Sequence, residues 1–332
     1  MKGTRRAALI FMLCALLLFV LPAYALAFEE LVPMGCTVGI ELETDGVAVA
    51  GFSEVETDGA AASPAAEAGM KAGDVITAVN GRSVRSAQEL LSALAALDGE
   101  KAEVTARRGT EELLFRIQPA KSTEGRWQLG LWLRDGVSGI GTVTWYDPES
   151  GRFGALGHGI NDMESGKLLP FDGGSITDAA VVDVVKGAPG APGELCGKPD
   201  PDRVLGALDK NTGCGIFGVA GFEDAGTPVP IAAPQEVYLG PASILTTVNG
   251  DGVEEYSVEI SRIYRQPEDH RFLMLTVTDP RLIEQTGGIV QGMSGSPILQ
   301  DGKLVGAVTH VLLSDATRGY GIAIQDMLDA AA

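Results

Sequence analysis

The sequence predicts an exported, mainly β protein in which an apolar N-terminal segment precedes two folded regions. Three observations lead to this prediction: the length of 332 residues, the 44 glycines with 17 prolines, and an uninterrupted apolar run near the N-terminus. A chain of this length fits about two domains. Frequent Gly and Pro favour short strands joined by turns over long helices. Hydrophobic residues make up 45% of the chain and aromatic residues only 6%, so its cores must be mainly aliphatic.

The composition argues against several functional classes. Lys and Arg number 25 against 44 Asp and Glu, giving a formal net charge of −19. The chain therefore lacks the basic surface that binds a phosphate backbone, and we expect no nucleic acid partner. Only 3 His and 4 Cys are present, without an HExxH or CxxC arrangement. We therefore expect no metal site and no cofactor.

Residues 1–28 are predicted to be a signal peptide or a membrane anchor. Basic residues within positions 2–6 precede an apolar run over residues 7–21, and small-x-small triplets follow at residues 23–27. This order is typical of a secretory signal. The apolar stretch extends to Phe28 and is long enough to span a bilayer, so an uncleaved anchor is the alternative. In both cases the positive-inside rule predicts export of the remaining chain across the cytoplasmic membrane.

Three cysteines fall in the predicted exported part: Cys36, Cys196 and Cys214. In an oxidising compartment Cys196 and Cys214 can form a disulfide. The alternative is that all three remain free thiols, and both states fit the sequence.

Residues 30–120 have the pattern of a small peptide-binding domain. The segment AGMKAGDVITAVNG, residues 68–81, is a turn followed by an alternating strand and an Asn-Gly turn. Ser86 can cap a helix over Ala87–Leu97, whose leucines recur at helical spacing. This combination resembles a PDZ domain of the bacterial type. The resemblance implies a groove in which an extended peptide adds as a strand, between that helix and a glycine-bearing loop. The loop and its strand contain Gly35, Cys36, Val38, Gly39 and Ile40.

Residues 125–332 alternate short strands with Gly, Pro and Asp turns, which is typical of an all-β barrel or sandwich. In the motif FGALGHGI, residues 153–160, His158 lies between two glycines. Such a histidine can face a cleft without crowding and exchange protons near neutral pH. A lone loop histidine can equally be solvated, so its significance depends on a nucleophile elsewhere in the chain.

A second glycine-rich motif supplies a candidate nucleophile. GGIVQGMSGSPI, residues 287–298, places Ser294 on a tight turn before a buried strand. Glycines beside the serine let backbone N–H groups converge, and we expect the amides of Gly292 and Ser294 to form an oxyanion hole. A plain turn is the competing interpretation.

A serine needs a base to take its proton, and that base needs a third group to orient it. Asp279, at the end of the strand that precedes the serine motif, is the expected third group. Asp162 and Asp183 are alternatives. Asp279 is followed by Pro280, so capping of a short helix is a second role that this residue can have.

The PDZ-like region, the motif FGALGHGI and the segment VTDPRLIEQTGGIVQGMSGSPILQDGKLVGAVTHV together are similar to the stage IV sporulation protein B family of serine peptidases. The resemblance implies a chymotrypsin-like fold of the double-barrel type and a serine endopeptidase whose triad is His158, Asp279 and Ser294. The acid lies closer to the serine along the chain than in ordinary chymotrypsin-like enzymes, although the order His, Asp, Ser is kept.

The same resemblance implies the partners and the location. The protein would cleave itself and a membrane-associated regulator of an intramembrane metalloprotease, in the sporulation signalling pathway that activates a late mother-cell sigma factor. It would act in the forespore intermembrane space, either anchored or released. Two alternatives remain open: a non-catalytic PDZ scaffold, and a general exported quality-control protease that carries a PDZ domain.

Overall fold

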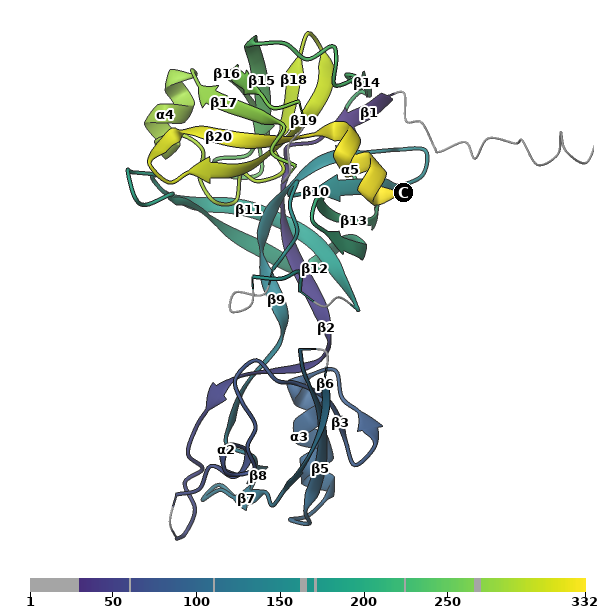
Figure 1. Ribbon diagram of the computed structural model, residues 1–332, viewed down its shortest axis with the longest axis vertical. Helices are drawn as coiled ribbons and strands as arrows, with labels where there is room; N and C mark the ends of the chain where they lie inside the picture. The colour runs from purple at the N-terminus through teal and green to yellow at the C-terminus, as the bar shows by residue number, and fades with distance from the viewer. Residues whose placement is uncertain are drawn as a thin grey trace, which may run out of the picture.

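The computed structural model describes residues 30–332 except 60, 110, 162–165, 170–171, 224 and 266–269. The predicted signal or anchor segment, residues 1–28, and the alternative acid Asp162 lie outside the described residues. Within the described ranges, no helix is both long enough and apolar enough to cross a bilayer. The chain forms a large upper lobe and a smaller lower lobe joined by two long strands (Figure 1).

A first antiparallel barrel forms half of the upper lobe. Its strands pair in the order β9-β10-β13-β12-β11-β2, and β2 pairs back with β9, which closes the ring. The members are β2 (Thr37–Phe52), β9 (Leu131–Tyr146), β10 (Arg152–Ala155), β11 (Gly173–Val185), β12 (Glu194–Thr212) and β13 (Gly215–Ala220). Two short strands, β1 (Glu30–Pro33) and β14 (Val229–Pro230), extend the sheet beyond β9.

A second closed barrel forms the other half, with strand order β15-β16-β17-β20-β19-β18. Its strands are β15 (Gly240–Thr246), β16 (Glu254–Ile263), β17 (Leu273–Val277), β18 (Pro297–Gln300), β19 (Lys303–Leu312) and β20 (Asp315–Ala323). The helix α4 (Pro280–Thr286) follows β17, and α5 (Ile324–Ala331) ends the chain. Buried side chains of α5 join Trp145 and Phe217 of the first barrel in one cluster, so α5 packs across both barrels. The predicted mainly β, double-barrel fold is confirmed.

The lower lobe contains the PDZ-like elements. They are α2 (Pro64–Glu67), β3 (Val75–Val79), β4 (Arg82–Ser83), α3 (Ala87–Ala96), β5 (Ala102–Arg108), β6 (Glu111–Ile117), β7 (Ala120–Lys121) and β8 (Trp127–Gln128). Ser86 caps α3 as predicted, because its hydroxyl accepts the amide N–H of Glu89 at 3.1 Å. The apolar side of α3, with Leu90 and Leu94, packs on the sheet in a separate aliphatic core.

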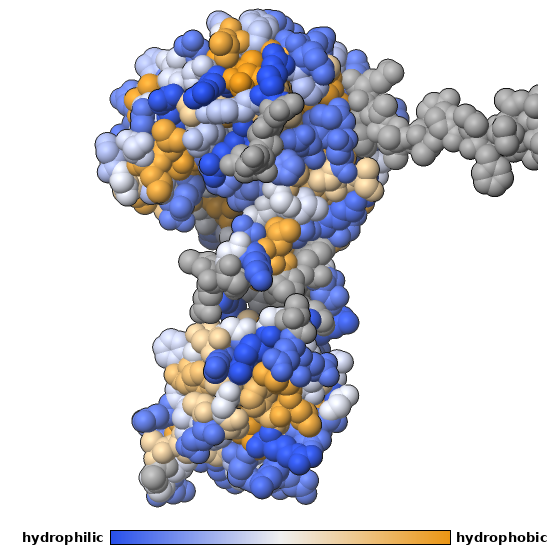
Figure 2. All heavy atoms as spheres, viewed as in Figure 1, coloured by the Kyte–Doolittle hydropathy of each residue, from blue (hydrophilic) through white to orange (hydrophobic). Residues whose placement is uncertain are grey.

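The PDZ-like domain is inserted into a hairpin of the first barrel. In the upper lobe β2 pairs with β9 through Leu42 and Val137, and the same two strands pair again in the lower lobe through Ala48 and Arg134. Figures 1 and 2 show the resulting narrow neck between the lobes. The structure therefore differs from the predicted boundaries at residues 30–120 and 125–332: the barrel begins before residue 46 and resumes after residue 134. The alternating apolar pattern of β2 does not reveal the insertion, because β2 is one continuous strand that contributes to the cores of both lobes.

Cys36, Cys196 and Cys214 are all free thiols. Of the two states that fit the sequence, the structure has the one without a disulfide between Cys196 and Cys214.

Candidate active site

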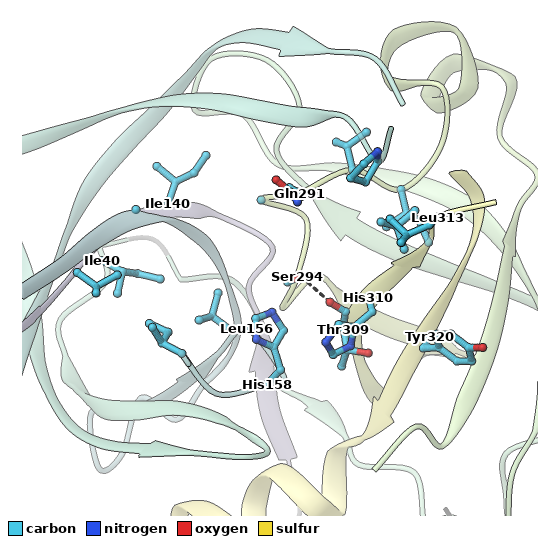
Figure 3. A pocket seen from close by; sticks show the side chains of 18 of the residues that line it. Ile40, Ile140, Leu156, His158, Gln291, Ser294, Thr309, His310, Leu313 and Tyr320 are labelled. Carbon is cyan, nitrogen blue, oxygen red and sulfur yellow. Dashed lines mark hydrogen bonds between the residues drawn. The ribbon is translucent and has the colours of Figure 1, made fainter. Parts of the chain in front are cut away.

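A cavity of about 630 Å³ contains both His158 and Ser294 in its lining (Figure 3). His158 comes from the loop after β10 of the first barrel, and Ser294 from the turn before β18 of the second. Other lining residues from the first barrel include Ile40, Ile140 and Leu156, and those from the second include Thr309, His310 and Val311. The structure thus brings together two predicted residues that are far apart in the chain.

A tight turn carries His158 to the second barrel. Leu156 and Gly157, which follow β10, both have a φ of 69°, in the left-handed region. A Cβ atom at Gly157 would lie 3.0 Å from side-chain atoms of Thr309 and Ile322. Glycine is therefore needed where the histidine loop meets β19 and β20.

The hydrogen bonding of His158 defines its tautomer. Its Nδ1 lies 3.0 Å from the carbonyl oxygen of Gly159. A carbonyl oxygen can only accept, so Nδ1 carries the proton and Nε2 is the basic nitrogen. Burial lowers the pKa of His158, and the bond to Gly159 opposes this effect only in part. The imidazole is therefore neutral at pH 7 and able to accept a proton.

Ser294 lies in a turn whose backbone favours glycine at two positions. Gly292 and Gly295 have φ values of 94° and 99°. A Cβ atom at Gly295 would lie 2.0 Å from the carbonyl oxygen of Thr142, far inside van der Waals contact. The Ser294 hydroxyl donates to the carbonyl oxygen of Thr309 at 2.6 Å (Figure 3). This hydrogen bond uses the single proton of the Ser294 hydroxyl, so the hydroxyl would have to rotate before it could donate to His158.

Thr142 of β9 holds this turn from the first barrel. Its amide donates to the carbonyl oxygen of Ser294 at 3.2 Å, and its Oγ1 donates to that of Gly292 at 2.8 Å. Within the described part of the chain, the N–H groups of Gly292 and Ser294 themselves donate to no acceptor. These two amides are therefore available to an oxyanion. The sequence contains no signal for Thr142, which is an ordinary strand residue remote from Ser294 in the chain.

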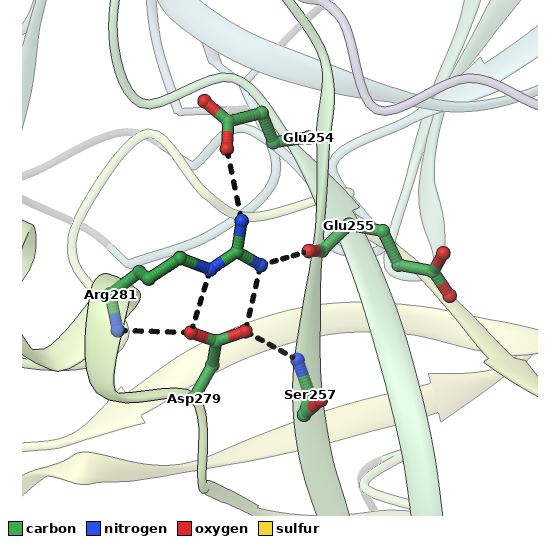
Figure 4. Close-up of polar contacts among 5 residues, drawn as sticks. All are labelled: Glu254, Glu255, Ser257, Asp279 and Arg281. Carbon is green, nitrogen blue, oxygen red and sulfur yellow. Dashed lines mark hydrogen bonds and ion pairs between the residues drawn. The ribbon is translucent and has the colours of Figure 1, made fainter.

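Asp279 is in a different environment (Figure 4). Its Oδ1 accepts the amide of Arg281 at 2.9 Å and caps α4, and its Oδ2 accepts Nη2 of Arg281 at 2.9 Å and the amide of Ser257 at 3.3 Å. The hydrogen bond from Arg281 lowers the pKa of Asp279 to about 2. Asp279 does not line the cavity. The structure therefore does not assemble the predicted triad, because the helix cap and the ion pair use both carboxylate oxygens.

The alternative acids do not replace Asp279. Asp183 is exposed on β11, where its carboxylate accepts the neighbouring amide of Val184 at 2.8 Å, and it does not line the cavity. Among the described residues, no Asp or Glu lines the cavity, and no three His, Cys, Asp or Glu are grouped as metal ligands would be. In this arrangement the carbonyl of Gly159 is the group that orients His158.

The five residues expected to form the PDZ loop belong to the first barrel instead. Gly35, Cys36, Val38, Gly39 and Ile40 lie at or within the upper part of β2, which pairs with β9 and β11. Burial raises the pKa of the Cys36 thiol to about 12, so this thiol is unreactive. Ile40 lines the cavity that contains His158. Strand pairing decides which sheet this segment joins, and a glycine-rich motif does not encode that pairing.

A different segment lies beside α3 in the PDZ-like domain. Residues 131–134, at the start of β9, pair with β2 along one edge and contact α3. Within the described residues, no strand pairs with their other edge. Trp132 on this segment is 65% exposed. An extended peptide could add as a strand at this edge.

Two families of known proteins match this chain. The family described as SpoIVB peptidase S55 matches residues 125–328, a range that includes His158 and Ser294, and the PDZ domain family matches residues 57–108. The chain belongs to the SpoIVB peptidase S55 family. This family and the PDZ match are those that the sequence resemblance predicted.

Individual relatives match smaller parts of this chain. Proteins from two strains of Xylella fastidiosa, named as zinc metalloproteases, are 36% identical over 93 residues, which is 27% of this chain and 20% of theirs. The chain thus spans about a fifth of the length of these curated relatives. The PDZ domain of an SdrC-like protein from Listeria monocytogenes is 27% identical, with 27% of this chain and 90% of that chain covered and a TM-score of 0.23. The Rv3671c protease from M. tuberculosis, in its active form, is 15% identical over 59% of this chain and 75% of its own, with a TM-score of 0.33.

Proposed function

We propose that the protein is an endopeptidase in which Ser294 is the nucleophile, His158 is the general base, and the amides of Gly292 and Ser294 bind the oxyanion. The observation that carries the proposal is the shared cavity: a neutral imidazole and a serine from different barrels line it beside two amides that have no acceptor in the described structure. These are the groups that acyl transfer requires.

The proposed reaction starts when the Ser294 hydroxyl leaves the carbonyl of Thr309. Nε2 of His158 takes the proton while Oγ attacks the peptide carbonyl, and the two amides stabilise the negative oxygen, each by roughly 3 kcal/mol. The Gly159 carbonyl keeps Nδ1 protonated and so maintains the reactive tautomer. His158 then gives the proton to the leaving amine, and water hydrolyses the acyl-enzyme.

We further propose that the substrates are the protein itself and a membrane-associated regulator in the sporulation signalling pathway that activates a late mother-cell sigma factor. In this proposal the chain is exported and is either anchored by its N-terminal segment or released by cleavage. Family membership, the apolar segment at residues 7–21 and the PDZ domain support it. The edge at residues 131–134 would hold an extended segment of the substrate.

The test compares Ser294→Ala with Ser138→Ala, which changes another serine lining the same cavity. We expect wild type and Ser138→Ala to react with a fluorophosphonate probe and to cleave themselves, and Ser294→Ala to do neither. N-terminal sequencing of the released protein would locate the cleavage site and distinguish signal from anchor. Self-cleavage of Ser294→Ala at the wild-type rate would overturn the catalytic proposal. Degradation of unfolded casein as rapid as cleavage of the regulator would overturn the proposed specific role.

A further inference from the structure

We propose that the cavity beside Ser294 binds an uncharged, apolar side chain of the substrate residue whose carbonyl is attacked, and that it rejects a basic side chain. This inference rests on the proposed endopeptidase function and names the substrate class of the same site.

The walls of the cavity are predominantly aliphatic. One side is the buried turn of Ile289 and Val290 before Ser294, and another is Val311 with Leu313 at the end of β19. Aliphatic residues of the first barrel complete the lining, and these are Ile40, Val137, Ile140, Leu156 and Ile160. With a volume of about 630 Å³, the cavity can hold a large apolar side chain together with neighbouring backbone.

The charges in the lining have one sign. The described lining includes no Asp or Glu, although the chain has 44 of these residues. Its ionisable members are Arg271, His158, His310 and Tyr320. The rings of His158 and His310 lie 5.0 Å apart, and the guanidinium of Arg271 lies over the ring of Tyr320 at 4.9 Å. Within the described lining, a substrate lysine or arginine would therefore find no carboxylate as a partner.

This distribution predicts an order of preference. A buried ammonium or guanidinium group needs a partner of opposite charge, and without one its desolvation is not compensated. A carboxylate is also disfavoured among aliphatic walls, but the positive charge of Arg271, an exposed member of the lining, repels a cation and not an anion. An apolar side chain loses no polar contacts on entry and gains from the removal of its surface from water. The expected order is apolar, then acidic, then basic.

Thr309 explains why the side chain next to the attacked carbonyl would be the one that enters. When the Ser294 hydroxyl turns towards His158, the carbonyl oxygen of Thr309 loses its donor. A backbone N–H of the substrate can take that place and align the peptide along β19. The adjoining side chain would then lie next to Val311 and the turn at residues 289–291, which line the same cavity.

The first experiment digests a proteome-derived peptide library with the purified full-length protein and reads the cleavage sites by mass spectrometry. We expect Leu, Ile, Val, Met and Phe to be enriched before the cleaved bond, and Lys and Arg to be depleted. In matched peptides, kcat/KM for Leu should exceed that for Lys by about 100-fold or more. Equal cleavage of the Leu and Lys peptides would overturn the inference.

Two variants test the cause of this preference. Val311→Asp places a carboxylate in the lining and should raise cleavage of the Lys peptide relative to the Leu peptide by about tenfold or more, whereas the similarly sized but uncharged Val311→Asn should not. Arg271→Gln removes a cation from the lining and should raise the same ratio about threefold. If neither Val311→Asp nor Arg271→Gln changes the ratio, charge does not set the preference and the inference fails.

Labelling by a fluorophosphonate separates the two possible failures. If the wild-type protein is labelled at Ser294 but shows no preference for an apolar residue before the cleaved bond, only the inference is contradicted. A protein that neither labels nor cuts any peptide contradicts the proposed function itself. For Val311→Asp, labelling also shows that the variant is folded. If Val311→Asp does not fold, the ratio of Lys to Leu cleavage in Arg271→Gln tests the inference.

Discussion

The cavity around His158 and Ser294 differs from the ion pair of Asp279 and Arg281 in how far its hydrogen bonds are satisfied. Both oxygens of Asp279 are bound by donors from α4 and β16. In the cavity, the amides of Gly292 and Ser294 have no acceptor within the described residues, and the Ser294 hydroxyl has a single hydrogen bond that rotation can break.

This difference separates a structural role from a chemical one. A carboxylate that is fully bound and whose pKa is about 2 stabilises the ends of α4 and β16 but has no capacity left for a second partner. Groups that act on a substrate must have spare donors or acceptors before it arrives. Changes at His158 should therefore affect mainly activity, and changes at Asp279 mainly stability.

The largest effect is expected at His158. His158→Ala removes the proposed base and should lower kcat by more than about 10⁴-fold, as removal of the base does in comparable sites. His270→Ala is the control, because this exposed histidine pairs with Asp326 and does not line the cavity. Rates with a chromogenic peptide measure both variants. If His158→Ala is about as active as His270→Ala, the cavity is not the catalytic centre.

Thr142→Val should have the next largest effect. It removes the hydroxyl that binds the Gly292 carbonyl, which should disorder the oxyanion turn and lower kcat about 10-fold to 100-fold with little change in KM. Thr144→Val is a matched control on the same strand, because Thr144 is equally buried and its hydroxyl has no partner in the described structure. Equal kcat values for the two variants would show that the first barrel does not position the turn.

The pH dependence of kcat/KM tests His158 without a substitution, and the expected effect is smaller. Burial lowers the pKa of His158 below 6.5, so the acid limb of kcat/KM should have its midpoint below pH 6.5 and fall tenfold per pH unit under it. The same shift lowers the free energy of unfolding as the pH falls below 6.5, because the unfolded state then binds more protons. Rate and unfolding profiles measure the two effects, and an acid limb centred above pH 6.5 would contradict the assignment.

Asp279→Asn should have the smallest effect on activity. Loss of the ion pair and a weaker cap should lower the free energy of unfolding by about 1 kcal/mol, and kcat should change less than about threefold. Asp279 contributes its stability above pH 3.8, and this contribution is lost as the pH falls towards 2. Asp279→Ser keeps a capping side chain and removes the charge. A 10⁴-fold loss of kcat in Asp279→Asn with unchanged stability would instead place Asp279 in a triad.

The sequence predicts local features of this molecule well. The cap at Ser86, the turn at Gly292–Gly295 and the cleft-facing loop at His158 are all set by residues within a few positions of each other. The family resemblance adds the double barrel, whose closure depends on pairings between remote strands.

The features that the sequence could not predict depend on long-range contacts. Thr142 reaches Gly292 across 150 positions of the chain, and no pattern near either residue indicates this contact. The spacing of Asp279 from Ser294 is compatible with a triad, but Arg281, only two positions away, competes for the carboxylate and forms the ion pair. The residues at 35–40 resemble a PDZ loop because glycine turns look alike in sequence whichever sheet they join.

The insertion of one domain into a hairpin of another has a consequence for folding. The first barrel closes only when Leu42 meets Val137, which are separated by the whole of the lower lobe. If the intervening chain is unfolded, bringing those residues together has a high loop-closure entropy. Once the lower lobe has folded, its two ends already lie on adjacent strands, and most of that entropy has been lost. The connectivity therefore favours folding of the small domain first. Its folded form holds the two halves of the hairpin together, and the first barrel can then close.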